Sequence, residues 1–248
     1  MKSRYRFLIF VAIVLSINCT RVSAQLTFDF ETGVVSTGYN NVRIPGNQGT
    51  LFSLNKDLNA SPELFYRIRM SYTIGKRHTL SALYAPLTTN YNGSVSNDID
   101  FAGEMFPANT DLYSTYKFNS YRLTYRYELV RKPNFEFGLG LTAKIRDARI
   151  ALSASGLEAE KTNVGFVPII NFRMFWHLNE KLGFLFEGDA LAAPQGRAED
   201  VLVAATYRLS DRIGFKAGYR LLEGGADNDE VYSFALFHYA AVGFYICL

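Results

Sequence analysis

The sequence of 248 residues has few cysteines, which could cross-link the chain, and few prolines, which could break a strand or helix: two and seven, respectively. It also contains only one tryptophan. Cys19 lies in the apolar N-terminal segment and Cys247 next to the C-terminus, so we expect no intrachain disulfide. After residue 25 no stretch is apolar enough to span a membrane as a helix, which needs about 20 apolar residues. These two absences exclude a disulfide-stapled scaffold and a helical membrane domain.

The N-terminal segment has the pattern of a secretory signal peptide. Its positive n-region consists of Lys2, Arg4 and Arg6. Residues 7–17 form an apolar h-region that is too short to span a membrane, and Val22, Ser23 and Ala24 then supply small or β-branched residues before the cleavage site. We therefore expect residues 1–24 to be a cleaved signal peptide.

Cleavage before Gln25 would leave residues 25–248 as one domain. The minor alternative is a lipoprotein that begins at Cys19, but Asn18 is larger than the residue that lipoprotein processing favours at that position. The whole chain has 26 basic and 23 acidic residues, a formal net charge of +3. Four of the basic residues and none of the acidic ones lie in residues 1–24, which leaves 22 basic against 23 acidic residues. We expect no nucleic-acid partner, which would need a clustered positive surface.

Apolar and polar residues alternate along most of the mature chain. Residues 120–129 (SYRLTYRYEL) place tyrosine and leucine on one face and arginine, threonine and glutamate on the other. This period of two predicts β-strands. We expect ten strands, with eight as the alternative count, over residues 26–37, 63–74, 77–87, 112–129, 133–151, 163–178, 181–190, 198–209, 212–222 and 231–247.

The connections between these strands alternate in length. Short polar turns are expected at 75–77, 131–134, 179–181 and 210–212. Longer connections are expected at 39–62, 88–111, 152–162, 191–197 and 224–229. Short periplasmic turns and long external loops are typical of outer-membrane barrels, as is an aromatic content of 15%. The sequence therefore predicts an all-β, antiparallel up-and-down transmembrane barrel. Its alternation slips near residues 119–120 and 146–147, where we expect β-bulges.

The polar faces of the strands carry both signs of charge in comparable numbers. In a narrow barrel they would point inward and pair across the lumen. The alternative is the solvated face of a soluble sheet, which shows the same alternation. The expected lumen charge network comprises Asp29, Glu31, Arg67, Arg69, Arg122, Arg126, Glu128, Glu136, Lys144, Arg173, Glu187, Asp189, Asp200, Lys216 and Arg220.

Four segments resemble small outer-membrane β-barrel proteins of Gram-negative bacteria. They are FNSYRLTYRYEL (118–129), LGLTAKIRDA (139–148), FEGDALAAPQGRAEDV (186–201) and GYRLLEGGADNDEVYSFALFHYA (218–240). The resemblance implies an outer-membrane location and carries no catalytic residue across. One departure is the C-terminus, which ends in Leu248 where such barrels usually end in an aromatic residue.

The sequence contains no convincing active site. Ser233 and His238 are five residues apart, which puts them on opposite faces of a regular strand. The acidic loop 223–230 is more typical of a solvated turn than of a calcium loop. We therefore expect a non-enzymatic barrel with a charged, largely filled lumen that acts structurally or through its external loops. The alternatives are a narrow pore or carrier for small solutes and a lipid-modifying enzyme. We expect no cofactor and no metal; the expected partners are outer-membrane lipid and the barrel-assembly machinery, and the sequence identifies no ligand.

Overall fold

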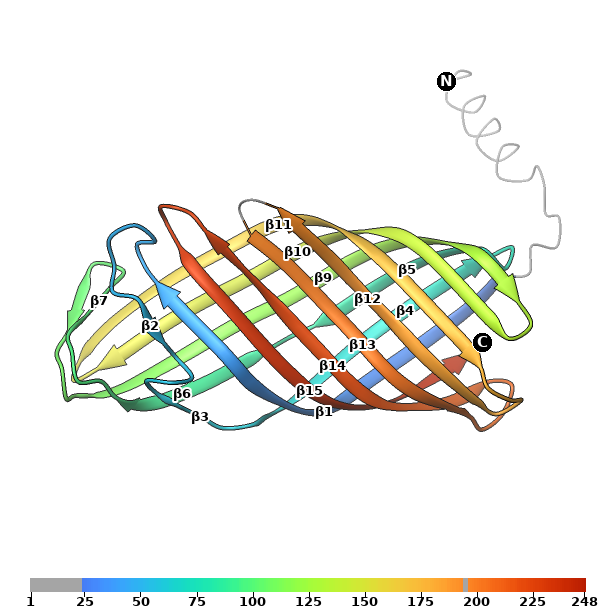
Figure 1. Ribbon diagram of the computed structural model, residues 1–248, viewed down its shortest axis with the longest axis horizontal. Coiled ribbons are helices and arrows are strands. Elements are labelled where there is room, and N and C mark those ends of the chain that lie inside the picture. The colour runs from blue at the N-terminus through green and yellow to red at the C-terminus, as the bar shows by residue number, and fades with distance from the viewer. Residues whose placement is uncertain (1–23, 194–195) are drawn as a thin grey trace, which may run out of the picture.

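The computed structural model describes residues 24–193 and 196–248 (Figure 1). The expected signal peptide lies outside the described residues except for Ala24, so its cleavage stays a prediction. In the described part of the chain, no helix is long and apolar enough to cross a membrane.

Eleven long strands form the wall of the barrel. They are β1 (Ala24–Arg43), β4 (Glu63–Ile74), β5 (His78–Ala85), β6 (Thr88–Ser94), β9 (Asp111–Lys132), β10 (Phe135–Ala154), β11 (Leu157–His177), β12 (Leu182–Ala193), β13 (Gly196–Arg208), β14 (Ile213–Asp227) and β15 (Tyr232–Cys247). Four short strands lie in the loops: β2 (Phe52–Ser53), β3 (Asn59–Ala60), β7 (Ile99–Phe101) and β8 (Glu104–Phe106).

The wall closes on itself, because β1 pairs with β15 and β9 pairs with β10. β5 and β6 both pair with β9 and are separated by Pro86 and Leu87, so they act as one strand of the wall. Proline has no N–H to give to the ladder, which accounts for a break at this point. Counted in this way, the barrel has ten antiparallel strands, as the alternation predicts.

The strands reach further from the short turns than the alternation suggests. Residues 39–43 belong to β1 and residues 88–94 form β6, both of which were expected as loop. The expected long loop at 152–162 is instead a tight hairpin, with Ser155 and Gly156 at positive φ. Beyond the membrane both faces of a strand can be polar, so backbone pairing continues after the side-chain alternation has faded.

The expected bulges near 119–120 and 146–147 are wrong, because β9 and β10 stay in register there. Tyr116 and Phe118 point inward like the polar residues that follow them, so the apparent slip marks a change in the polarity of the lumen. The irregularities lie elsewhere: opposite the Phe137–Gly138 step, which leaves Leu129 out of the ladder, and between Thr37 and Tyr39 in β1.

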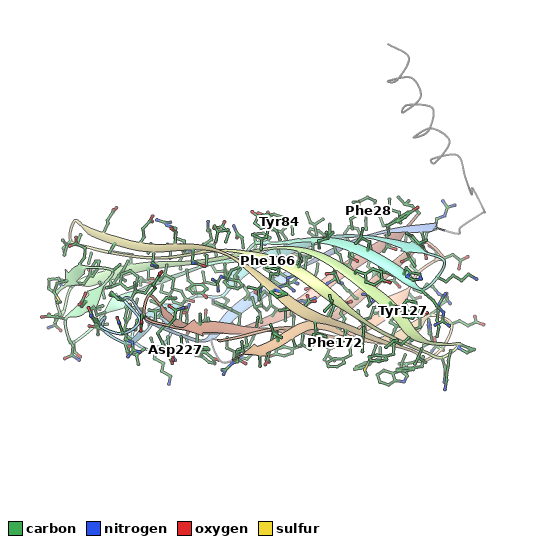
Figure 2. All side chains as sticks on the ribbon, turned by 90° about the horizontal axis from the view of Figure 1, so that it is seen from above. Phe28, Tyr84, Tyr127, Phe166, Phe172 and Asp227 are labelled. Carbon is green, nitrogen blue, oxygen red and sulfur yellow. The ribbon has the colours of Figure 1, made fainter. Side chains whose placement is uncertain are left out.

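Large apolar side chains cover the outside of the wall. Leu123, Leu141 and Phe166 are 54%, 67% and 67% exposed, and Figure 2 shows Phe28 and Tyr84 on the outside as well. Aromatic side chains contact one another between strands, for example Tyr84 and Tyr121 with ring centres 5.1 Å apart. An outward apolar band with aromatic residues is what a bilayer requires of a β-barrel.

The two connections at the outer end, residues 44–62 and 95–110, fold into an ordered cap beside the barrel mouth. Leu54, Phe101 and Phe106 from this cap are fully buried. The cap carries β2, β3 and β7 at the end of the barrel opposite the C-terminus (Figure 1). We call that end the outer end and the other one the short-turn end.

Candidate functional site

The middle of the lumen is filled by charged side chains that meet across the barrel. Asp200 on β13 accepts a hydrogen bond from Arg67 on β4, at 2.9 Å, and forms an ion pair with Arg122 on β9, at 2.6 Å. Arg220 on β14 also binds the Asp200 carboxylate. Arg122 further bonds Asp189 on β12 at 2.6 Å. All five side chains are at most 6% exposed, so this cluster is a buried, cross-lumen network.

A second group of charges joins this cluster from β1 and β14. Glu31 accepts two hydrogen bonds from Arg220, at 2.6 and 2.9 Å. Lys216 donates to Asp29 at 2.7 Å and lies 3.1 Å from Glu31. The bidentate pairing of a planar guanidinium with a carboxylate fixes both side chains. With the five residues above, these make eight, which we call the central ion-pair cluster: Asp29, Glu31, Arg67, Arg122, Asp189, Asp200, Lys216 and Arg220. Arg69 and Glu187 add a further pair at 2.7 Å.

A smaller group of charges lies nearer the short-turn end. Arg126 donates to Glu128 at 3.0 Å, and Arg173 donates to Glu136 at 3.1 Å. Arg173 also lies 4.0 Å from Glu128, which links the two pairs. The structure thus gives fourteen of the fifteen expected lumen residues an ionic partner, and Lys144 is the exception among them.

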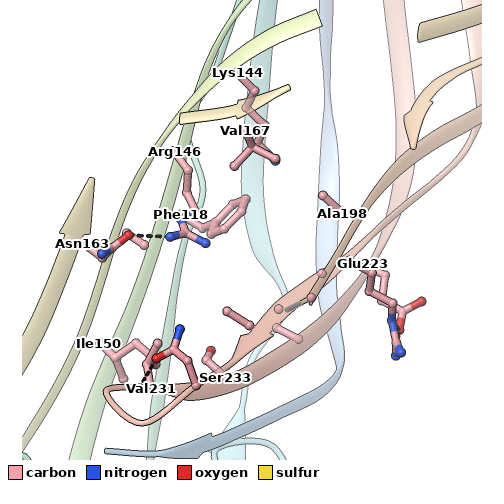
Figure 3. Close-up of a pocket in the computed structure, with 18 of the residues that line it drawn as sticks. Phe118, Lys144, Arg146, Ile150, Asn163, Val167, Ala198, Glu223, Val231 and Ser233 are labelled. Carbon is pink, nitrogen blue, oxygen red and sulfur yellow. Dashed lines mark hydrogen bonds and ion pairs between the residues drawn. The ribbon is translucent and has the colours of Figure 1, made fainter. Parts of the chain in front are cut away.

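Above the central ion-pair cluster the lumen opens into a cavity of about 780 Å³, which we call the outer chamber. Its walls come from β9, β10 and β11 on one side and from β13, β14 and β15 on the other. Figure 3 shows Phe118, Lys144 and Arg146 on one side of this space, with Ala198 and Glu223 across from them. The volume lies within the range of small-molecule sites, about 300–1,000 Å³.

Polar pairs surround the upper part of the outer chamber. Lys161 on β11 donates to Glu230, beyond the end of β14, at 3.0 Å. Glu223 on β14 accepts hydrogen bonds from Arg197 and from Tyr39. Both carboxylates therefore already have cationic partners.

The outer chamber was missed at the sequence level. Its inward apolar residues, such as Tyr116, Phe118, Ile150 and Phe237, occupy the same alternate positions as the charged residues further down each strand. The signal that could have revealed it is the unbroken parity itself, which was interpreted as two bulges. Read without bulges, the parity places apolar side chains on the lumen side.

The three histidines do not meet a nucleophile and a carboxylate together. His238 contacts the hydroxyl of Tyr219 through Nδ1, on the face opposite to that of the buried Tyr239. His78 bonds the Tyr125 hydroxyl at 2.8 Å, and His177 lies 3.9 Å from Glu136. In the ranges 24–193 and 196–248, no three histidine, cysteine, aspartate or glutamate residues are grouped as metal ligands would be.

The fold resembles that of a solved outer-membrane protein. The outer-membrane protease OmpT of Escherichia coli is 12% identical, with a TM-score of 0.57, and the match covers 90% of this chain and 97% of that chain. Ail, the attachment invasion locus protein of Yersinia pestis, is 9% identical, with a TM-score of 0.40 and coverage of 90% and 99%. The toluene transporter TodX of Pseudomonas putida is 10% identical, with a TM-score of 0.38 and coverage of 89% of each chain.

No protein-family model and no curated protein matches this chain. The closed antiparallel wall and the outward apolar band nevertheless define the class: the chain has the fold of the outer-membrane β-barrels of Gram-negative bacteria. Such a wall belongs in an outer membrane, as the alternation and the resemblance predict.

Proposed function

We propose that this protein is a non-enzymatic outer-membrane barrel that binds a ligand in its outer chamber and keeps its lumen closed below it. The observation that carries the proposal is that Arg67 and Arg122 reach Asp200 from across the lumen, where Arg220 of the neighbouring strand also binds it. A solute on its way to the short-turn end would have to break these buried pairs. Removing one partner of a buried ion pair costs about 3–5 kcal/mol, which makes the cluster a plug.

Barrel size supports a closed lumen. Eight-stranded barrels are filled by side chains, and open aqueous channels occur at about 16–18 strands. Ten strands lie near the filled end of this range, and here the filling consists of long charged side chains rather than apolar ones. The outer chamber is blocked on the side of the short-turn end by the central ion-pair cluster, which suits binding rather than passage.

The chemistry of the outer chamber also favours binding. A lipid-modifying enzyme needs a nucleophile, a base and an orienting group within hydrogen-bond reach. Ser233 lines the chamber, but no histidine does among the described residues. His238 lies on the outward face with Tyr219. The partners that we propose are outer-membrane lipid around the wall and the barrel-assembly machinery during insertion.

Conductance measurements in planar lipid bilayers test the proposal. We expect the purified barrel to insert without giving a steady ohmic conductance, whereas a general porin in the same bilayer should give one. A steady wild-type conductance would contradict the plug and favour the narrow pore, which is the alternative function.

A further inference from the structure

Lys144 is a buried cation at the floor of the outer chamber, and none of the described residues is its counter-ion. Its side chain is on β10 and only 3% exposed. In the described part of the chain it forms neither an ion pair nor a hydrogen bond, and its Nζ lies 4.8 Å from the ring centre of Phe118. The charges of the central ion-pair cluster are balanced among themselves. An ammonium that is buried without a partner is costly, and an anion in the chamber would offset that cost.

Arg146 is a second cation at the next inward position of the same strand. One of its terminal nitrogens donates to Asn163 on β11, while its Nε is buried and has no hydrogen-bond partner among the described residues. Gly165 lies opposite Arg146 in the ladder, and a Cβ there would come within 3.0 Å of the guanidinium. Glycine at this position therefore leaves room for the arginine to lie in the chamber (Figure 3).

Most of the remaining wall near these cations is apolar. Phe118, Val167, Leu222 and Phe237 line the chamber, and the last two are at most 7% exposed. A small inorganic anion would leave this surface without contacts. An acyl chain attached to the anion would cover it and gain the hydrophobic contribution of each buried methylene, about 0.8 kcal/mol.

The chamber extends to a gap in the barrel wall. β11 pairs with β12 only from Ile170 to His177, and its outer half, residues 157–169, pairs with β10 alone. Pro168 lies just above the last paired residue and has no N–H to donate to a neighbouring strand. Val167 and Pro168 on one side of the gap and Leu191 on the other line the chamber.

This gap lies at the level of the membrane-facing surface. On the outward side of β11, Val164 is 71% and Phe166 is 67% exposed. Large apolar side chains at that height need a lipid environment. A hydrocarbon chain in the outer leaflet would therefore meet the gap without crossing a polar rim.

We propose that the outer chamber binds a single-chain anionic amphiphile, with its carboxylate or phosphate head on Lys144 and Arg146 and its chain leaving through the gap between β11 and β12. This inference rests on the proposed binding function and adds the ligand class and the route. It requires an anionic head, because Lys144 and Arg146 at the floor of the chamber are cations without an ionic partner among the described residues. It also requires an apolar tail, because the wall is apolar.

The test is equilibrium binding of radiolabelled hexadecanoate to the full barrel in phosphatidylcholine nanodiscs, with empty nanodiscs subtracted. Wild-type protein should bind hexadecanoate at least tenfold more tightly than hexadecyltrimethylammonium. Lys144→Met should weaken hexadecanoate binding at least tenfold, and Arg146→Gln should weaken it severalfold. Lys181→Met, on an exposed short turn, is the matched control and should leave binding unchanged.

Lys144→Met should also keep the wild-type heat-modifiable gel shift, because no ion pair is lost. A lost shift would show that Lys144 supports the fold. The binding of hexadecanoate to Arg146→Gln would then decide whether the chamber contains an anion site. Equal binding by wild type and both variants overturns the anion site. Comparing hexadecyl phosphate with inorganic phosphate separates the contribution of the apolar chain to binding from that of the anionic head. Tighter binding of hexadecyl phosphate supports an amphiphilic ligand, and equal binding of the two overturns it.

The route has its own test in a Cys247→Ser background. Cysteines at Pro168 and Ala192, both on the outward side of the gap, can be joined by a bismaleimide. Closing the gap should slow hexadecanoate association at least tenfold, and an unchanged rate overturns the lateral route. These readouts are independent of conductance, so a failed amphiphile site and a failed plug are distinguishable.

Discussion

The two halves of the barrel use the same ten strands but fill their interior differently. Toward the short-turn end, the inward positions carry arginine, lysine, aspartate and glutamate that pair across the lumen. Toward the outer end, the same alternate positions of the same strands carry Phe118, Ile150 and Leu222, and a cavity remains. The same strands run through both halves, but the β11–β12 ladder ends in the outer half. Side-chain type and this early end of the ladder together decide between plug and chamber.

The comparison shows why a charged lumen need not be a channel. Long side chains that reach across a narrow barrel can neutralise one another, and the geometry then closes the passage. Shorter apolar side chains at the same positions cannot reach the centre, which leaves space. A cation at the boundary, such as Lys144, belongs to neither half and is therefore available to a ligand.

The largest expected contrast is between the two ends of the molecule. Single cysteines can be placed at Asn92, near the outer end, and at Lys132, at a short turn, in a Cys247→Ser background. Since long loops of outer-membrane barrels face the exterior, an impermeant thiol reagent on whole cells should label the first and spare the second. The reverse pattern, or equal labelling, would refute this orientation.

The next largest effect is expected where the plug is densest. Arg220→Met removes the cation shared by Glu31 and Asp200, all of which are nearly inaccessible to solvent. Leaving two buried carboxylates undercompensated should lower the free energy of unfolding by about 3–5 kcal/mol. The measurement is the urea midpoint at which the heat-modifiable gel shift is lost.

The matched control for this substitution is Arg197→Met in the outer half. Arg197 pairs with Glu223, but its side chain is 45% exposed. Exposed ion pairs contribute about 0–1 kcal/mol, so the midpoint should move little. Equal shifts for the two variants would show that burial in the plug does not distinguish the halves.

The sequence predicted more of the fold than of the candidate site. Alternation in segments such as 120–129 is a local signal of period two, and it gave the strands, their number and their inward faces. It did not give the ends of β1, β6 or β10, because side chains outside the membrane need not alternate. It also missed the chamber: a cavity depends on how far inward side chains reach, and on the early end of the β11–β12 ladder, which no single strand encodes.

A smaller effect is expected for Arg126→Ala, nearer the short-turn end. Arg126 is 13% exposed and bonds Glu128 at 3.0 Å, while Arg173 lies 4.0 Å from the same carboxylate and can partly compensate for the loss. A charge-assisted hydrogen bond contributes about 1.5–3 kcal/mol, so the destabilisation should be less than for Arg220→Met. The central cluster remains intact, and bilayer recordings should show no large conductance. A conductance step in this variant would show that the lumen is closed nearer the short-turn end than we infer.

The smallest effect is expected for His238→Ala, which changes the outward face of the wall and leaves the interior of the barrel intact. His238 lies on the outward face beside Tyr219, so its loss should cost about 1 kcal/mol, as for one partly exposed hydrogen bond. Because it points away from the outer chamber, the substitution should alter no lipid. Mass spectrometry of lipids from deletion, overexpression and His238→Ala strains measures this directly. An acyl chain that changes with the intact protein and not with the variant would make His238 part of an active site and promote the lipid-modifying alternative.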